Sequence, residues 1–262
     1  MVKLIAIDLD GTLFNSKSKI STENREAIKS CLDKGIKVIL STSKTIYSVG
    51  KIIKELGLVD PQMASGGAAI INKDLEPLFT LKVPPNIVGE VIDLSRKYKK
   101  GLALSSADGN IYYESKHPGI EHIASTGDRV IRVGSLRERK IMDNILLITL
   151  TIDSGDRFNK IIKDNFNGRV KIKRGGPIFL TILNKKAGKL FALKKIMEMV
   201  GITKAEIVSI GDSENDLETI KFAGVGIAMA NAPESLKRAA NYTVSNNDLN
   251  GVAEALHKYC LK

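Results

Sequence analysis

The sequence predicts an α/β protein whose parallel sheet, covered by helices on both faces, is interrupted by an inserted α+β region with an antiparallel sheet. Strand and helix patterns alternate over residues 1–81, and this order favours a parallel sheet. Over residues 82–186, strand patterns follow one another around few helices, which is typical of an antiparallel α+β domain. The alternation then resumes. We therefore expect one discontinuous domain, residues 1–81 and 187–262, with a second domain inserted into it.

The first five elements alternate in type. Residues 22–34 predict a helix, because apolar residues recur at helical spacing after an N-cap at Ser21 or Thr22, with Gly35 as the stop signal. Residues 36–42 form a β-branched apolar run, which predicts a buried strand. The other elements expected here are a strand over 3–8, a helix over 45–58 and a strand over 63–71 that carries a glycine pair.

The inserted region is expected to begin with a helix that follows two prolines, at positions 84 and 85. Residues 102–115 predict a hairpin with Asp108-Gly109 as its turn. The remaining elements expected in this region are strands at "NILLITLTI" (144–152), "GRVKIKRG" (168–175) and "PIFLTIL" (177–183), and one helix near 155–166.

The C-terminal part returns to the α/β pattern. The elements expected there are a helix over 188–200, a strand and turn over 206–213, a helix over 214–223, a strand over 224–230, a helix over 232–240, a short strand at "NYTVS" (241–245) and a last helix over 248–259.

Length and composition agree with a globular protein of two domains. The chain has 262 residues, 43% of them hydrophobic, which is enough for a full core. We find no transmembrane-length apolar run and no leader pattern at the N-terminus, so we expect a cytoplasmic protein without a membrane partner. Cys31 and Cys260 lack metal-ligand spacing and are expected to be two reduced thiols.

The net charge of +11 comes from 40 Lys and Arg against 29 Asp and Glu. Its basic clusters are short and scattered, and aromatic residues make up 5% of the chain, which poorly supplies stacking surfaces for nucleic acid. We interpret this positive charge first as a solvated surface, second as a sign of a phosphate-bearing substrate and third as a sign of nucleic-acid binding. We expect no nucleic-acid partner, and either a monomer or a homodimer.

Polar and charged residues gather where the predicted strands end. Asp8 and Asp10 directly follow the first strand, and like charges this close require a counter-charge. The carboxyl ends of parallel strands share one edge of a sheet, where such folds bind ligands. The other candidates at that edge are Ser41, Thr42, Ser43 and Lys44 after the second strand, Lys189 at a helix start, and Asp212, Asn215 and Asp216 after a later strand.

This combination predicts a magnesium site that handles phosphate. Several oxygen ligands without His or thiolate suit Mg²⁺, which would supply the missing counter-charge. Lys189, the Thr42 hydroxyl and backbone N–H groups around Gly11 could then hold a phosphate group beside it. A carboxylate is free to attack phosphorus, since Asp can form an aspartyl-phosphate intermediate.

The four segments resemble the four motifs of the haloacid-dehalogenase (HAD) superfamily of phosphatases. The matching stretches are "DLDGTL" (8–13), "STSKT" (41–45), the helix-borne Lys189 and "GDSENDL" (211–217). The tail "GVGIAMANAPESLKRAANYTVSNNDLNGVAEAL" is similar to the Cof-type subfamily, whose type IIB cap lies between motifs two and three. The resemblance implies a Rossmann-like HAD core and a substrate-specificity cap over residues 82–186.

The resemblance also implies roles for individual residues. Asp8 would be the nucleophile. Asp10 would protonate the leaving oxygen and then activate water, while its backbone carbonyl binds Mg²⁺. The other implied roles are phosphoryl or substrate binding for Thr42, Ser43, Lys44, Lys189 and Asn215, and metal binding for Asp8, Asp212 and Asp216, with Asn215 completing or orienting the metal site.

Three positions depart from the Cof-type pattern. Many members have Thr-Gly-Arg at motif two, where this chain has Thr42-Ser43-Lys44, and its "SKT" triplet is similar to mannosyl-3-phosphoglycerate phosphatases. Gly66-Gly67-Ala68 replaces a common Asn-Gly-Ala loop, and Leu190 follows Lys189 where glycine is usual. These departures concern the substrate. Lys44 could add a positive charge for a second anionic group.

Three hypotheses follow for function. The first is a Mg²⁺-dependent phosphatase of a small phosphorylated metabolite, with cap residues such as Lys171, Lys173 and Arg174 either meeting the substrate or forming an exposed basic strand. The second is a phosphosugar mutase, which would pass the phosphoryl group to another hydroxyl. The third is a non-catalytic module that binds anions or nucleic acid, and the complete set of motif acids speaks against it.

Overall fold

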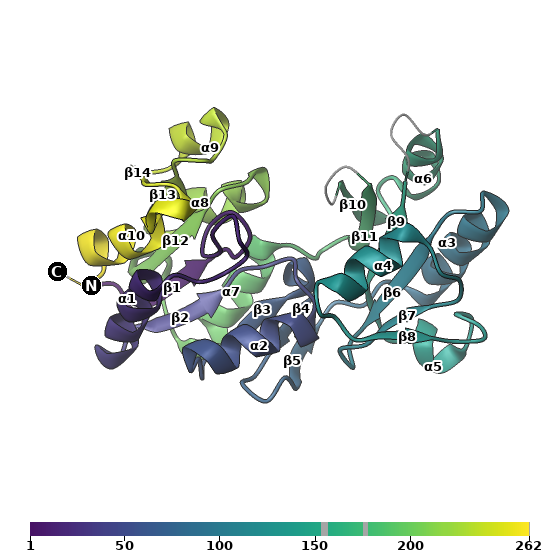
Figure 1. The fold of residues 1–262 in the computed structure, drawn as a ribbon, viewed down its shortest axis with the longest axis horizontal. Coiled ribbons are helices and arrows are strands. Elements are labelled where there is room, and N and C mark those ends of the chain that lie inside the picture. Colours follow the sequence, from purple (N-terminus) through teal and green to yellow (C-terminus); the bar gives the residue numbers. More distant parts are fainter. Residues whose placement is uncertain (153–156, 175–177, 262) are drawn as a thin grey trace.

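The computed structural model describes residues 1–152, 157–174 and 178–261, and its elements gather around two main sheets (Figure 1). One part, the core, is built around a five-stranded parallel sheet. The other part, the cap, has a six-stranded sheet and four helices among its described residues, and it lies beside the core in Figure 1. The predicted fold class, an α/β core with an inserted α+β cap, is confirmed.

The core sheet has the strand order β14-β13-β12-β1-β2, and every neighbouring pair is parallel. Helices cover both of its faces, so the central strands β1 and β12 consist of apolar and small residues that are buried on either side, whereas the edge strand β14 is partly exposed. The strands are β1 (Leu4–Ile7), β2 (Lys37–Leu40), β12 (Ile207–Gly211), β13 (Val225–Met229) and β14 (Tyr242–Val244).

The core helices divide between the two faces of this sheet. Alternate residues of β1 point to opposite sides: Ile5 packs in the cluster of α1, α2 and α10, whereas Leu4 packs in the cluster of α7. Ser21 is the N-cap of α1, and its side chain accepts a hydrogen bond from the Asn24 backbone. The helices are α1 (Thr22–Asp33), α2 (Ile46–Leu56), α7 (Lys189–Val200), α8 (Leu217–Phe222), α9 (Glu234–Ala239) and α10 (Gly251–Tyr259), with 3-10 turns at η2 (Lys204–Glu206), η3 (Glu214–Asp216) and η4 (Asn247–Leu249).

The strand predicted over residues 63–71 is wrong in form, because the glycine pair ends it. The chain turns at η1 (Ser65–Gly67), where Gly66 and Gly67 have φ values of 64° and 84° that favour glycine. The segment therefore folds back as part of a small antiparallel sheet, and it meets the parallel sheet through an isolated parallel bridge between Ser41 and Met63. That sheet consists of β3 (Gln62–Ala64), β4 (Ala69–Ile71) and β5 (Pro77–Thr80).

The cap sheet has the order β10-β11-β9-β6-β7-β8 and is antiparallel except between β7 and β8. The predicted hairpin is confirmed: β6 and β7 pair antiparallel across Asp108-Gly109, with Gly109 at a φ of 82°. The cap strands are β6 (Leu102–Ser106), β7 (Ile111–Tyr113), β8 (Val130–Arg132), β9 (Ile145–Thr151), β10 (Val170–Arg174) and β11 (Phe179–Asn184).

The cap contains more helices than its sequence pattern predicts. The predicted helices correspond to α3 and α6, whereas α4, α5 and strand β8 were not expected. The cap helices are α3 (Pro85–Lys97), α4 (Pro118–Ser125), α5 (Arg139–Met142) and α6 (Phe158–Phe166). Residues 155 and 156 of the predicted helix, and residues 175 and 177 at the predicted strand ends, lie outside the described residues.

The core has an apolar interior around β1 and β2, and the cap has one around β6, β9 and α3. Leu146, Leu147 and Leu183 of the cap strands pack with the core interior, so the two parts also meet through apolar contacts. Cys31 and Cys260 are both buried in the core interior as free thiols. Among the described residues, we find no helix that combines the length and the apolar character needed to cross a membrane.

Candidate active site

A cavity of about 440 Å³ lies between the carboxyl ends of the core strands and the cap sheet. Its core side is formed by residues that follow β1, β2 and β12, and its cap side by residues of β6, β9, β10 and β11. The cavity thus occupies the edge of the parallel sheet that the sequence indicates.

Asp8 lies at the base of this cavity, directly after β1, and is 6% exposed. Its backbone N–H donates to the Ile210 carbonyl at 3.0 Å, which continues the pairing of β1 with β12. The segment of Asp8 is therefore fixed by the sheet before any side-chain contact is made.

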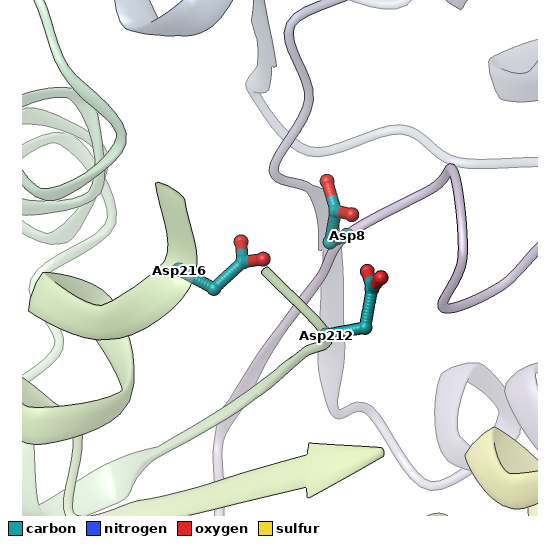
Figure 2. A group of neighbouring side chains, drawn as sticks. All are labelled: Asp8, Asp212 and Asp216. Carbon is teal, nitrogen blue, oxygen red and sulfur yellow. The ribbon is translucent and has the colours of Figure 1, made fainter. Parts of the chain in front are cut away.

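Three carboxylates converge at this point. Asp8, Asp212 and Asp216 each offer one oxygen, and these oxygens all lie within 4.8 Å of one another. Figure 2 shows the three side chains pointing toward a common space, Asp8 from the end of β1 and the other two from the segment after β12. Their convergence brings residues about 200 positions apart into one acidic cluster.

Lys189 bridges two of these acids. It is the first residue of α7 and is 4% exposed, and its Nζ lies 2.6 Å from Asp8 Oδ1 and 2.6 Å from Asp216 Oδ1. The start of α7 lies tightly against η1: a Cβ built on Gly67 would come within 2.2 Å of the Gly188 carbonyl oxygen. The glycine pair of the sequence therefore permits the close approach that brings Lys189 into the cluster.

The remaining carboxylate oxygens have fixed partners. Asp216 Oδ2 accepts hydrogen bonds from the Ser213 backbone N–H at 3.1 Å and from its hydroxyl at 2.9 Å. The hydroxyl of buried Thr12 donates to Asp212 Oδ1 at 2.8 Å. Gly11 has a φ of 83°, and a Cβ there would lie 2.3 Å from Asp212 Oδ2. Only glycine fits at this turn.

Burial makes the cluster unfavourable for full ionisation. It raises the pKa of Asp8 to about 8 against the opposing charge of Lys189. Burial also raises the pKa of Asp212 despite the Thr12 hydrogen bond, and the charge of Asp216 adds to this effect. Although burial acts in the other direction on Lys189, the charges of Asp8 and Asp216 raise its pKa. One lysine against three carboxylates leaves negative charge in excess.

The donor set fits a hard divalent cation. The converging atoms are carboxylate oxygens only, and such ions prefer oxygen ligands. A divalent cation would also offset the charges of Asp216 and Asp212, which add to the effect of burial in raising the pKa of Asp8. The cluster is therefore compatible with a bound metal ion.

Asp10 lies apart from the acidic cluster. Its side chain is 63% exposed at the cavity mouth, and its Oδ1 lies 3.0 Å from Lys44 Nζ. Thr42 is buried, and its hydroxyl accepts from the Lys44 backbone N–H at 3.1 Å. Thr42, Ser43 and Lys44 all line the cavity.

The cap supplies a mixed wall to the cavity. Lys173 of β10 donates to Asn215 Oδ1 at 2.9 Å, which joins the cap to the segment after β12. The other cap residues along the wall are the hydroxyl-bearing Ser105, Thr149 and Thr181, the apolar Ile111, Ile123, Leu147, Phe179 and Leu183, and the charged Arg174 and Asp128.

The structure brings together most of the residues that the sequence singles out. Asp8, Asp10, Thr42, Ser43, Lys44, Lys189 and Asn215 line one cavity, and Asp212 and Asp216 lie at its base with Asp8. Sequence reasoning missed Thr12 and Ser213 as holders of the acids, although both stand within the motifs. It also missed Asp128, for which no local pattern gave a signal.

Comparisons with known proteins agree with this geometry. Residues 5–256 match the family model of haloacid dehalogenase-like hydrolases. A Bacillus subtilis relative named 5-amino-6-(5-phospho-D-ribitylamino)uracil phosphatase YcsE is 30% identical over 261 residues, covering 99% of this chain and 96% of that protein. A second, YwtE, bears the same enzyme name and is 31% identical over 280 residues, covering 96% of each.

Solved structures of haloacid dehalogenase-like hydrolases are also similar to this chain. A haloacid dehalogenase-like hydrolase from Bacteroides thetaiotaomicron is 28% identical, with a TM-score of 0.92 over 98% of this chain and 99% of that one. A Thermotoga maritima protein is 26% identical, with a TM-score of 0.87 over 100% of this chain and 99% of that one. The chain belongs to the haloacid dehalogenase-like hydrolases, and within that family it is a phosphatase.

Proposed function

We propose that this protein is a Mg²⁺-dependent phosphomonoester hydrolase that acts on a small phosphorylated metabolite through an aspartyl-phosphate at Asp8. The observation that carries the proposal is the cluster of buried Asp8 and Asp216 with partly buried Asp212, in which Lys189 lies 2.6 Å from two of the acids. A phosphate group and its metal need this combination of oxygen ligands and positive charge at one point.

In the first step, an oxygen of Asp8 forms a bond to phosphorus while the bond from phosphorus to the leaving oxygen breaks. Asp10 gives its proton to that leaving oxygen. In the second step, Asp10 takes a proton from water, whose oxygen attacks phosphorus and releases phosphate and free Asp8. The exposure of the Asp10 side chain at the cavity mouth supports this exchange of protons.

The chain's other residues hold the phosphoryl group during both steps. Lys189 and the Thr42 hydroxyl would bind its oxygens, together with backbone N–H groups around Gly11. Asp8, Asp212, Asp216 and the backbone carbonyl of Asp10 would hold the metal. Mg²⁺, when bound, would neutralise charge on the phosphoryl oxygens and lower the cost of ionising Asp8.

The cap is proposed to select the leaving group. We place its borders near residues 82 and 186, where the two connecting segments lie together: Asn184 Nδ2 donates to the Lys82 carbonyl at 2.8 Å. The cap wall combines hydroxyl groups with an apolar surface that includes Phe179. This suits a polyol or sugar phosphate that also carries an apolar or ring face, and the substrate in the names of YcsE and YwtE combines these features.

A substrate screen with Mg²⁺ tests the proposal. The panel consists of sugar phosphates, phosphoglycolate, mannosylphosphoglycerate, nucleotides, pyridoxal phosphate and 5-amino-6-(5-phospho-D-ribitylamino)uracil. We expect phosphate release from at least one of them, lost in Asp8→Asn and on chelation of the metal. Phosphate release that survives Asp8→Asn would contradict the assigned nucleophile, and isomer formation without phosphate release would favour a phosphosugar mutase.

A further inference from the structure

The cap touches the core at a second place, away from Lys173, at the start of helix α2. Asp128 stands in the loop between α4 and β8, and its Oδ1 accepts hydrogen bonds from the hydroxyls of Thr45 and Ser48, the latter at 2.6 Å. These two residues are the N-cap and the first turn of α2. A cap carboxylate is thus seated on the N-terminus of a core helix.

This contact places a negative charge at the N-terminus of α2. A helix N-terminus carries partial positive charge and favours an anion in its first turn. In α2, all of whose residues are described, the first turn contains no acidic residue of its own. Asp128 supplies the missing negative charge from the cap, about 80 residues along the chain.

The loop that carries Asp128 is shaped for this contact. Lys51, one turn further along α2, donates to the Gly127 carbonyl at 3.1 Å. Gly127 has a φ of 83°, and a Cβ there would lie 2.8 Å from Lys51 Nζ. The hydroxyl of Thr126 lies 3.2 Å from the second oxygen of Asp128, and its shorter contact is to the Ile123 carbonyl at 2.7 Å. The loop is therefore held against α2 at two points, the Asp128 carboxylate and the Gly127 carbonyl.

The same contact reaches the active site. Asp128 and Thr45 both line the cavity, and Thr45 directly follows the segment of Thr42, Ser43 and Lys44. We propose that Asp128 is a positioning residue whose carboxylate holds the cap against α2 and thereby keeps the cavity closed around bound substrate. The expected effect of Asp128 on KM rests on the proposed function, whereas its expected effect on the position of the cap does not.

Cap position can be measured without any substrate. Spin labels are attached at Val59 in the core and Lys140 in the cap, both exposed, in a chain whose Cys31 and Cys260 are replaced by alanine. Distance distributions are compared for the parent, Asp128→Ala, Asp128→Asn and Ser48→Ala. Asp164→Ala, an exposed acid on α6, is the matched control.

We expect Asp128→Ala to add a population with a changed label distance. Asp128→Asn, which keeps an oxygen acceptor without the charge, should show a smaller population, and Asp164→Ala none. On a substrate identified in the screen, Asp128→Ala should raise KM by at least about tenfold, because it removes charge-assisted hydrogen bonds. The value of kcat should change by less than about threefold, since bound substrate restores closure.

Unchanged distance distributions in Asp128→Ala, Asp128→Asn and Ser48→Ala would overturn the proposal. A changed distance with an unchanged KM would overturn the link between Asp128 and the cavity. If Asp128→Ala fails to fold, the label distances in Asp128→Asn and Ser48→Ala decide whether the proposal holds. If the parent protein hydrolyses no phosphomonoester, the proposed function fails, but the distance measurement still decides whether Asp128 holds the cap.

Discussion

The core and the cap enclose the same cavity with surfaces of opposite character. On the core side, buried charged groups are tied together by ion pairs of 2.6 Å between Lys189 and two acids. On the cap side, hydroxyl and apolar side chains such as Thr181 and Phe179 form most of the wall, beside a few charged residues. The core surface suits one chemical step, whereas the cap surface can change without disturbing that step. In the proposed function, chemistry and substrate choice are thus assigned to different parts of the cavity.

The largest effect is expected from Lys189→Met in the core. Removing the lysine leaves Asp8 and Asp216 buried without their cation, which should lower the free energy of unfolding by about 3–5 kcal/mol. It should also lower kcat by about 10²–10³-fold on every substrate. Urea unfolding and steady-state kinetics measure the two effects, with exposed Lys194→Met on the same helix as the control. A loss of kcat confined to some substrates would contradict the assignment of chemistry to the core and substrate choice to the cap.

Metal binding should stabilise the core through the acidic cluster. With Mg²⁺ at a hundred times its Kd, the free energy of unfolding should rise by about 2.7 kcal/mol. The gain should vanish in Asp212→Asn, which removes one ligand, and on addition of a chelator. Thermal unfolding with and without Mg²⁺ measures this, with Asp164→Asn in the cap as the control. Equal stabilisation of Asp212→Asn would place the metal elsewhere.

Phe179→Ala in the cap should change substrate preference and leave the chemistry intact. Phe179 lines the cavity and packs against the ring of His122, with centroids 5.7 Å apart. We expect KM to rise by about tenfold for a substrate with an apolar or ring face, which corresponds to the loss of about 1.4 kcal/mol. For phosphoglycolate, kcat/KM should change by less than about threefold. Ile178→Ala, at an exposed neighbouring position, is the control.

The smallest effect concerns Lys173, where the cap and the core meet. Burial lowers its pKa to about 8, and the charges of Lys171 and Lys189 add to this. Because the folded pKa lies below the unfolded value, the charged lysine costs stability at pH 7, and this cost disappears as the pH rises from about 8 to about 10.5. Lys173→Met should therefore raise Tm by about 2–4 °C at pH 7 and by much less at pH 10.

Melting curves at the two pH values, with exposed Lys160→Met as the control, measure this difference. An equal rise in Tm at both pH values would show that the gain comes from apolar packing rather than from removal of the charge. No rise at pH 7 would show that the hydrogen bond of Lys173 to Asn215 outweighs the cost of its charge.

Sequence patterns predicted the core well because its central strands are apolar runs buried on both faces and alternate regularly with helices. The runs around β1, β2 and β12 are apolar and end in polar residues, so their strands and the edge that they share could be inferred without coordinates. The cap was predicted less completely. Its α4 and α5 have 8 and 4 residues, too short for a clear helical period.

The sequence by itself determined the fold class and most residues of the candidate site, because most of these residues follow a strand or begin a helix. Tertiary structure decided which of those residues contact one another. It seats Lys189 between Asp8 and Asp216, turns Asp10 toward Lys44, and brings Asp128 to α2. These contacts join segments far apart in the chain, and local patterns carry no information on them because the positions depend on how whole sheets and helices pack.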